Sequence, residues 1–262
     1  MFQTQRLPLS LLMLTASPFV FADNHNNQGT EAVQDMSDPL AVYTQVGMGY
    51  TDKGLNLKLG QTFDTGSDTT MGMHVLELKG GYGDALGARD YADDSIDSLR
   101  LRRFGVDLTN GRGSQVDFNY DFDSEAGSLS YSFIQAIPAL GPLQLYPLAG
   151  VGAAFANNAL GDNGETISGY TVPGTFAVVG AYGKLTLTDN IWLNYNPMYM
   201  STLSGSDTYK EHAFADNDSI LAHEFAASYQ INPRLNVRYF AQWNEELSYR
   251  DGSHIVEFNY QL

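Results

Sequence analysis

The segment Gln115-Val-Asp-Phe-Asn-Tyr-Asp-Phe122 alternates strictly between polar and apolar side chains. A period of two is typical of a β-strand with one apolar face and one polar face, because successive side chains point to opposite sides. The same alternation recurs in residues 55–59, 235–239 and 256–262. No window of a dozen residues after residue 40 carries a helical stripe, so the sequence predicts an all-β fold.

Twelve segments with this period follow one another between residue 40 and the C-terminus. The predicted strands are residues 40–50, 53–63, 70–80, 97–109, 114–123, 127–137, 143–156, 175–187, 190–202, 218–230, 234–246 and 253–262. The long polar loops, residues 81–96, 157–174 and 203–217, all fall at odd-numbered connections, and every even-numbered connection is shorter. This asymmetry is typical of a transmembrane β-barrel. The sequence therefore predicts an antiparallel up-and-down barrel over residues 40–262 with about 12 strands, ten or fourteen being near alternatives.

One uncharged stretch, residues 126–161, has the composition of a membrane-spanning helix. Pro138, Pro142 and Pro147 lie within it and would break a helix. We therefore predict two strands joined by a turn rich in proline and glycine.

The N-terminal residues carry a targeting signal. Arg6 is the only charged residue before Asp23, an apolar run follows it, and Val20 and Ala22 occupy the −3 and −1 positions of a cleavage site. This pattern predicts a secretory signal peptide over residues 1–22 that is removed before folding. Residues 23–39 have almost no apolar content and are predicted to form a disordered acidic tail.

The composition excludes several classes of function. The chain has no Cys, which rules out a disulfide scaffold and Cys-based metal or thiol chemistry. Fourteen Lys and Arg stand against 30 Asp and Glu, and the formal charge of −16 argues against a nucleic-acid-binding protein.

The chain ends in a strand whose last residues are Phe258-Asn-Tyr-Gln-Leu262. With this ending, the signal peptide and the loop asymmetry, it resembles the outer-membrane proteins of Gram-negative bacteria as a class, in which Phe is a commoner last residue than Leu. The resemblance implies a place in the bacterial outer membrane, contact with lipid and lipopolysaccharide, and recognition by the barrel-assembly machinery through Phe258, Tyr260 and Leu262. The soluble alternative is a secreted β-sandwich or periplasmic barrel, whose aromatic faces would need a second sheet to cover them.

In a membrane barrel the polar faces of the strands point into the interior. The residues predicted to line it are Lys58, Glu77, Arg100, Arg102, Asp117, Asp121, Glu224, Arg238 and Glu257. The alternation changes phase at Arg102-Arg103, which predicts a β-bulge that would also keep Asp107 inside. Across the following turn, Asp121 is expected near Arg102 and Asp117 near Asp107. The opposite wall is predicted to be small and neutral, from residues such as Ser130, Ser132 and Gly152.

Two functions fit this interior. The first is a porin-like channel for passive diffusion of small polar solutes, in which the charged residues set a weak selectivity. The alternative is a plugged barrel with an interaction role, whose acidic outer loops bind a partner or divalent cations. By strand count and size the chain resembles the small twelve-stranded porins that pass acidic sugars. Its balanced interior charges depart from their basic lumens, so that preference does not carry over.

No motif predicts an enzyme or a cofactor. None of the five histidines, His25, His74, His212, His223 and His254, has a nearby Ser or Asp in a recognisable catalytic signature. The acidic loops at residues 90–97 and 207–218 lack the spacing of an EF-hand and are predicted to be solvated. The aromatic residues near strand ends are predicted to form girdles at the membrane interfaces. They are Tyr43, Tyr50, Tyr146, Tyr195, Tyr199, Tyr229, Trp192 and Trp243.

Overall fold

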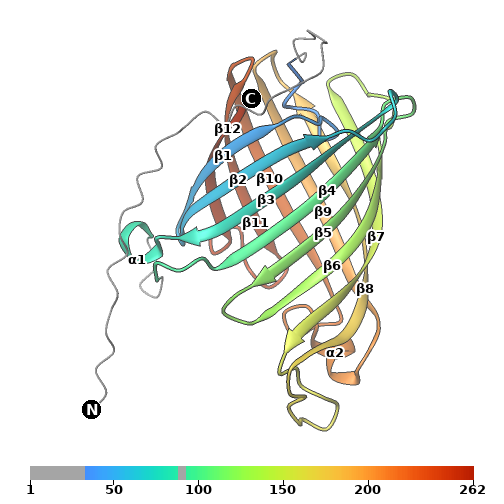
Figure 1. Cartoon of the computed structure of the whole chain (residues 1–262), viewed down its shortest axis with the longest axis vertical. Helices are drawn as coiled ribbons and strands as arrows, with labels where there is room; N and C mark the ends of the chain where they lie inside the picture. Colours follow the sequence, from blue (N-terminus) through green and yellow to red (C-terminus); the bar gives the residue numbers. More distant parts are fainter. Residues whose placement is uncertain (1–32, 88–92) are drawn as a thin grey trace. The chain divides into compact units, whose positions relative to one another are not determined.

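A computed structural model describes residues 33–87 and 93–262. In this part of the chain twelve strands form a closed barrel in which each strand pairs antiparallel with its neighbours in sequence, and β1 pairs with β12 (Figure 1). The strands are β1 (Gln45–Thr51), β2 (Gly54–Phe63), β3 (Thr70–Gly81), β4 (Ser98–Asp107), β5 (Arg112–Asp121), β6 (Ala126–Gln135), β7 (Leu143–Asn157), β8 (Tyr170–Thr186), β9 (Ile191–Gly205), β10 (Ser219–Asn232), β11 (Leu235–Asn244) and β12 (Ser253–Gln261). The predicted up-and-down barrel is therefore confirmed, and so is the strand number.

The strand boundaries differ most from the prediction in two places. β1 begins at Gln45 and not at residue 40, because the chain before Thr44 leaves the wall and packs Leu40 and Val42 in the barrel interior. β8 begins at Tyr170 and not at residue 175, because Tyr170 and Thr171 still pair with β7 beyond a β-bulge. The predicted signal peptide, residues 1–22, lies outside the described residues.

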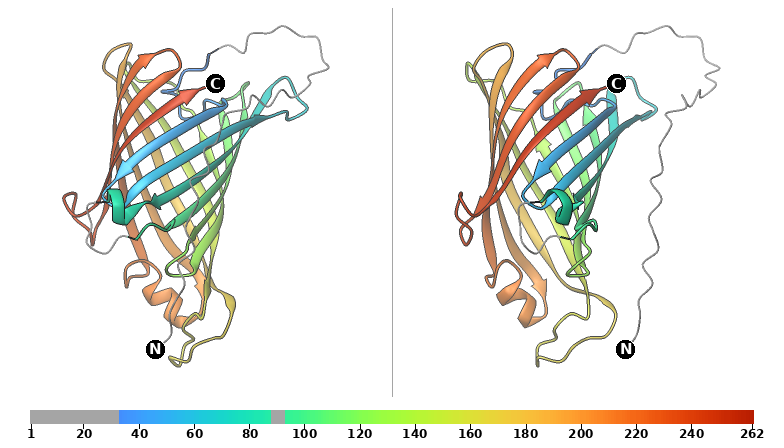
Figure 2. Two further views of the ribbon diagram at one scale, coloured as in Figure 1. Left: turned by 60° about the vertical axis from the view of Figure 1, so that its left-hand side comes forward. Right: turned by 90° about the vertical axis from the view of Figure 1, so that its left-hand side faces the viewer.

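The two ends of the barrel differ in their connections (Figure 2). At the end that holds the C-terminus, here called the turn end, the connections are residues 64–69, 108–111, 136–142, 187–190 and 233–234. At the opposite, loop end they include residues 82–97, 158–169 and 206–218, with the short helices α1 (Gly83–Leu86) and α2 (Asp207–His212). The predicted asymmetry of loops is thus present. Gly111 and Gly141 adopt left-handed backbone angles, φ +65° and +63°, which explains glycine in two of the tight turns.

The outer face of the wall is apolar. Large exposed apolar side chains occur on strands all around the barrel, including Leu57, Leu59, Leu101, Leu129, Phe133, Val151, Val179 and Phe258. A monomeric soluble protein rarely exposes a continuous apolar surface of this kind, whereas a membrane barrel turns such a face to lipid. In the described part of the chain, no helix has the length and apolar character needed to cross a bilayer.

Candidate functional site: the barrel interior

The barrel encloses a cavity of about 800 Å³. Its lining comes from strands around the whole wall and from the residues that precede β1. Eight of the nine residues predicted to line the interior do so: Lys58, Glu77, Arg100, Arg102, Asp117, Glu224, Arg238 and Glu257. Whether solutes pass along them remains a prediction.

Most of these charges form ion pairs between different strands. The ammonium of Lys58 lies 2.5 Å from a carboxylate oxygen of Glu257, which joins β2 to β12 across the closure of the barrel. Arg100 makes a bidentate contact with Asp117 at 2.5 and 3.0 Å. We call the five residues Glu77, Lys79, Arg100, Arg102 and Asp117 the charged band.

Glu77 is the centre of the charged band. Its carboxylate accepts a hydrogen bond from Arg102 and lies 4.0 Å from the ammonium of Lys79. Glu77 is only 9% exposed. Removal of one partner from a buried pair leaves an uncompensated charge and costs about 3–5 kcal/mol, so these contacts also rigidify the wall.

The two signs of charge are not equally accessible within the charged band. The side chains of Lys79 and Arg100 are 34% and 33% exposed, whereas their carboxylate partners Glu77 and Asp117 are 11% and 14% exposed. The carboxylates are covered by the cations that bind them. Within the charged band, the positive groups are therefore more accessible than the negative ones.

Arg238 and Glu224 are held differently, by neutral hydrogen-bonding groups. Arg238 donates to Ser228 Oγ at 3.0 Å and to Asn194 Oδ1 at 2.9 Å. Glu224 accepts from Asn196 and Gln242 at 2.8 and 2.7 Å. These bonds orient both side chains and leave each charge able to interact with a solute.

The phase change at Arg102-Arg103 is not a β-bulge. The pairing of β4 with β3 and β5 runs without a shift from Ser98 to Asp107. Arg103 consequently lies on the outer face, with its guanidinium 4.6 Å above the ring of Phe63. The apolar residues that follow, Phe104 and Val106, point inward and line the cavity.

Asp107 and Asp121 hold turns and do not line the cavity. Asp107 accepts hydrogen bonds from Thr109 and Asn110 in the 108–111 turn. Asp121 accepts from the backbone and hydroxyl of Ser124 at the loop end. In the observed register Arg102 faces Asp117, and Asp121 faces Ser98, so the expected neighbours of both carboxylates were wrong.

One interior wall is apolar, which the sequence did not predict. The side chains of Val178, Met200 and Ile220 lie in register on β8, β9 and β10. Met198 and Phe176 extend this surface. We call these five residues the apolar wall.

Two glycines make room for the apolar wall. A Cβ atom on Gly152 would lie 2.4 Å from the ring of Phe176, and one on Gly180 would lie 2.4 Å from the sulfur of Met198. Phe214, from the loop-end connection after α2, packs edge-on against Phe176 with ring centroids 6.0 Å apart. The predicted small, neutral wall is present where Ser130 and Ser132 line the cavity. At Gly152 the ring of Phe176 covers it.

Residues 33–44, here called the mouth segment, lie inside the turn end. Leu40 and Val42 pack against Met73, Val75 and Val106 of β3 and β4. Asp38 accepts a 3.0 Å hydrogen bond from the hydroxyl of Tyr146 on β7, and the ammonium of Lys184 on β8 lies 3.4 Å from Asp35. Met36 is 6% exposed, and its sulfur accepts from Gln230 and Asn236.

These contacts reach strands on opposite sides of the barrel, so the mouth segment crosses the interior. For residues 33–39 this replaces the predicted disordered tail with a folded segment; residues 23–32 lie outside the described residues. Burial opposes ionisation of Asp35, but hydrogen bonds from Ser37 and the ammonium of Lys184 outweigh it, so the pKa of this carboxyl lies below its ordinary value of 3.8. The stabilisation from the ion pair between Asp35 and Lys184 is therefore fully present above pH 3.8. It is lost only as the pH falls through the lower pKa that Asp35 has in the folded state.

The predicted aromatic girdles are only partly observed. Tyr50, Tyr195, Tyr199 and Tyr229 are exposed on the outer face, as expected. Tyr146 and Trp192, at 1% and 3% exposure, are buried instead. Both side chains face inward, because side chains alternate along a strand and the residues next to them in β7 and β9 point outward. Tyr43 belongs to the mouth segment.

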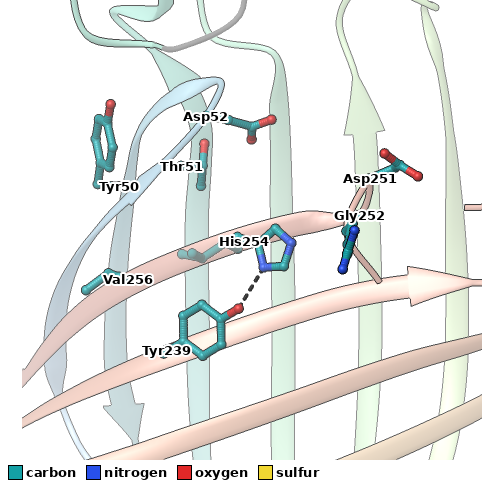
Figure 3. A pocket seen from close by; sticks show the side chains of 10 residues that line it. Tyr50, Thr51, Asp52, Tyr239, Asp251, Gly252, His254 and Val256 are labelled. Atoms are coloured by element: carbon teal, nitrogen blue, oxygen red, sulfur yellow. Dashed lines mark hydrogen bonds between the residues drawn. The ribbon is translucent and has the colours of Figure 1, made fainter. Parts of the chain in front are cut away.

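Two histidines join an aromatic cluster outside the barrel. His223 stacks on Trp243 and accepts or donates a 2.8 Å hydrogen bond with the hydroxyl of Tyr195. His254 bonds the hydroxyl of Tyr239 at 2.7 Å beside a hollow of about 530 Å³ between β1, β11 and β12 (Figure 3). Both rings are thus satisfied by tyrosine. Among the described residues, neither ring makes a hydrogen bond or ion pair with a carboxylate, as a catalytic histidine would.

The acidic loops make local hydrogen bonds. Asp93 accepts from the backbone of Ser95, and Asp207 lies 2.6 Å from Lys210 within α2. Asp90 lies outside the described residues. Within the described ranges, no three His, Asp or Glu side chains gather as a metal site would require.

Comparison with known proteins identifies the architecture. No family model matches the sequence, and no curated protein does. Among solved structures, the NanC porin matches with a TM-score of 0.53 and 10% identity, over 84% of this chain and 100% of its own. The COG4313 outer membrane channel from Pseudomonas putida F1 matches with a TM-score of 0.54 and 8% identity, over 87% and 99%. The fold is that of an outer-membrane porin-like β-barrel.

Proposed function

We propose that this protein is a channel of the bacterial outer membrane that lets small polar solutes diffuse passively. The observation that carries the proposal is the cavity of about 800 Å³ inside a closed barrel, whose lining includes charged side chains of both signs. Eight-stranded barrels are filled by their own side chains, whereas sixteen strands leave an aqueous channel, so twelve strands leave room for a narrow path. The NanC porin and the COG4313 channel, which share the fold, are themselves channels by name.

Membrane insertion explains the outer surface. The exposed apolar belt would face lipid, and the exposed tyrosines would lie at its edges beside lipopolysaccharide and phospholipid headgroups. The barrel-assembly machinery would have access to Phe258 and Tyr260 on β12 and to Leu262 at the C-terminus. These side chains are 48%, 42% and 55% exposed. A cleaved signal peptide over residues 1–22 would deliver the chain. We expect no enzymatic activity.

A specific observation also supports the second candidate, a plugged barrel that acts through its loops. The mouth segment crosses the turn end, and ion pairs fill part of the interior. This candidate needs a closed lumen, whereas the channel needs one that admits solutes.

A liposome-swelling assay separates the two candidates. Purified protein is reconstituted into vesicles, which are diluted into isotonic solutions of uncharged solutes of increasing size. A channel predicts fast swelling in the smallest solute, such as glycerol or arabinose, and progressively slower swelling in larger sugars. Swelling no faster than in protein-free vesicles, from protein that is folded and heat-resistant, would contradict the channel and favour the plugged barrel.

A further inference from the structure

The apolar wall is unexpected in a path for hydrophilic solutes. Interiors of water-filled barrels are normally polar, because apolar side chains gain nothing from contact with water. Here Val178, Met200 and Ile220 form a continuous row across three strands, and Met198 lies in the row below it. The glycines at 152 and 180 hold this surface open for Phe176 and Met198. These side chains together form an apolar surface inside the barrel.

The character of this face changes along the strands. One row further toward the turn end, β9 and β10 carry Asn196 and Glu224 in place of Met198 and Ala222. An apolar surface with a sharp polar limit fits a solute that has an apolar part and a polar part.

The opposite side of the same cavity offers positive charge. β3 and β4 lie about half a turn around the barrel from β9 and β10. Lys79 and Arg100 expose 34% and 33% of their side chains, whereas the carboxylates that pair with them expose 11% and 14%. Within the charged band, a solute therefore meets ammonium and guanidinium groups before it meets the carboxylates that pair with them. Glu224 lies on the opposite side, one row from Met198, and its carboxylate is held by the amides of Asn196 and Gln242.

We propose, building on the channel function above, that the interior favours organic anions with an apolar body, such as small aromatic acids, over hydrophilic solutes. The aromatic part lies against Met198 and Met200, and the anionic group interacts with Arg100 and Lys79 across the cavity. An anion without an apolar body interacts only with Arg100 and Lys79. A neutral sugar gains neither this interaction nor the contact with the methionines.

Current block in planar bilayers tests this selectivity with two anions of equal charge. Benzenesulfonate carries an aromatic ring, methanesulfonate does not, and both stay ionised, so neither crosses the lipid as a neutral acid. Each is titrated against the chloride current of the purified full chain. We expect benzenesulfonate to reach half-block at a concentration about tenfold lower, the advantage of covering part of an aromatic ring.

Substitution of the apolar wall locates the effect. Met198→Ser with Met200→Ser is expected to reduce the difference between the two anions to about threefold or less. The matched control is Tyr199→Ser, because Tyr199 lies between these methionines but points outward and is 44% exposed. This control should keep the tenfold difference.

The outcomes separate the solute class from the channel function. Chloride current with equal block by the two anions overturns the solute class and leaves the channel standing. An aromatic preference of full size in the folded double variant overturns the role of the apolar wall. Absence of any current contradicts the channel itself. The comparison of the two anions on the unsubstituted protein is decisive even if the double variant fails to fold.

Discussion

Deletion of residues 33–42 is expected to raise single-channel conductance at least about threefold. The mouth segment crosses the turn end and contacts β3, β4, β7, β8, β10 and β11, so it occupies cross-section that ions would otherwise use. Its anchors are apolar on one side, at Val42, and polar on the other, at Asp38. Single-channel recording of the deletion variant beside the unmodified chain gives the ratio directly.

A smaller change tests the same constriction. Leu40→Ser with Val42→Ser weakens the packing against Met73, Val75 and Val106 and should produce frequent transitions to a higher conductance. The matched control is Leu108→Ser, a substitution of the same type in a turn-end connection, where the side chain is 56% exposed. This control should behave as the unmodified protein. Unchanged conductance in the deletion variant would show that the mouth segment does not limit the path.

Reversal of one charge in the charged band is the second large expected effect. Arg100→Glu removes a positive group that is 33% exposed and places a carboxylate beside Asp117 and Glu77. A change of two charge units at about 6 Å in an aqueous path is worth about 1.4 kcal/mol, or about tenfold in the ratio of anion to cation permeability. Reversal potentials in a salt gradient measure that ratio, and the shift should be toward cations.

The neighbouring arginine supplies the control for this charge reversal. Arg103→Glu alters the net charge of the protein by the same amount, but Arg103 lies on the outer face over Phe63. Ion selectivity should therefore not change in this variant. Equal shifts in the two variants, or no shift in either, would show that the charged band does not face the permeating ions.

The alternation of polar and apolar residues predicted the barrel well, for a physical reason. Membrane lipid favours apolar side chains on the outer face of every strand, and the interior favours polar ones on the inner face. Each strand therefore shows an alternation of polar and apolar residues in its sequence. The segment from Gln115 to Phe122 shows this plainly, and β5 contains all of it except Phe122. The lengths of the connections between strands also predicted that the long loops lie at one end of the barrel.

The interior was harder to predict, because apolar residues occur there as well as outside. Phe104 and Val106 point inward, and their apolar character was interpreted as a phase change with a β-bulge. The same ambiguity hid the apolar wall, since Met198 and Met200 alternate with Tyr199, whose ring is also largely apolar. In such strands polarity does not distinguish the two faces, and only the register with neighbouring strands does.

The mouth segment was missed for a different reason. Residues 33–39 contain few apolar side chains, so their composition is that of a disordered tail. Their position depends on specific partners, such as Tyr146 and Lys184, that lie more than a hundred residues away in the sequence. The apolar side chains of Met36, Leu40 and Val42 were the one signal that could have indicated an internal segment.

The most direct test of a solute path through this barrel is single-channel recording of residues 23–262, refolded and inserted into a planar bilayer. The account predicts uniform, ohmic current steps that are small because the mouth segment narrows the turn end. A folded, heat-resistant barrel that conducts no current above the leak of the empty bilayer would contradict it. Current that appears only after deletion of residues 33–42 would likewise show that the native lumen is closed.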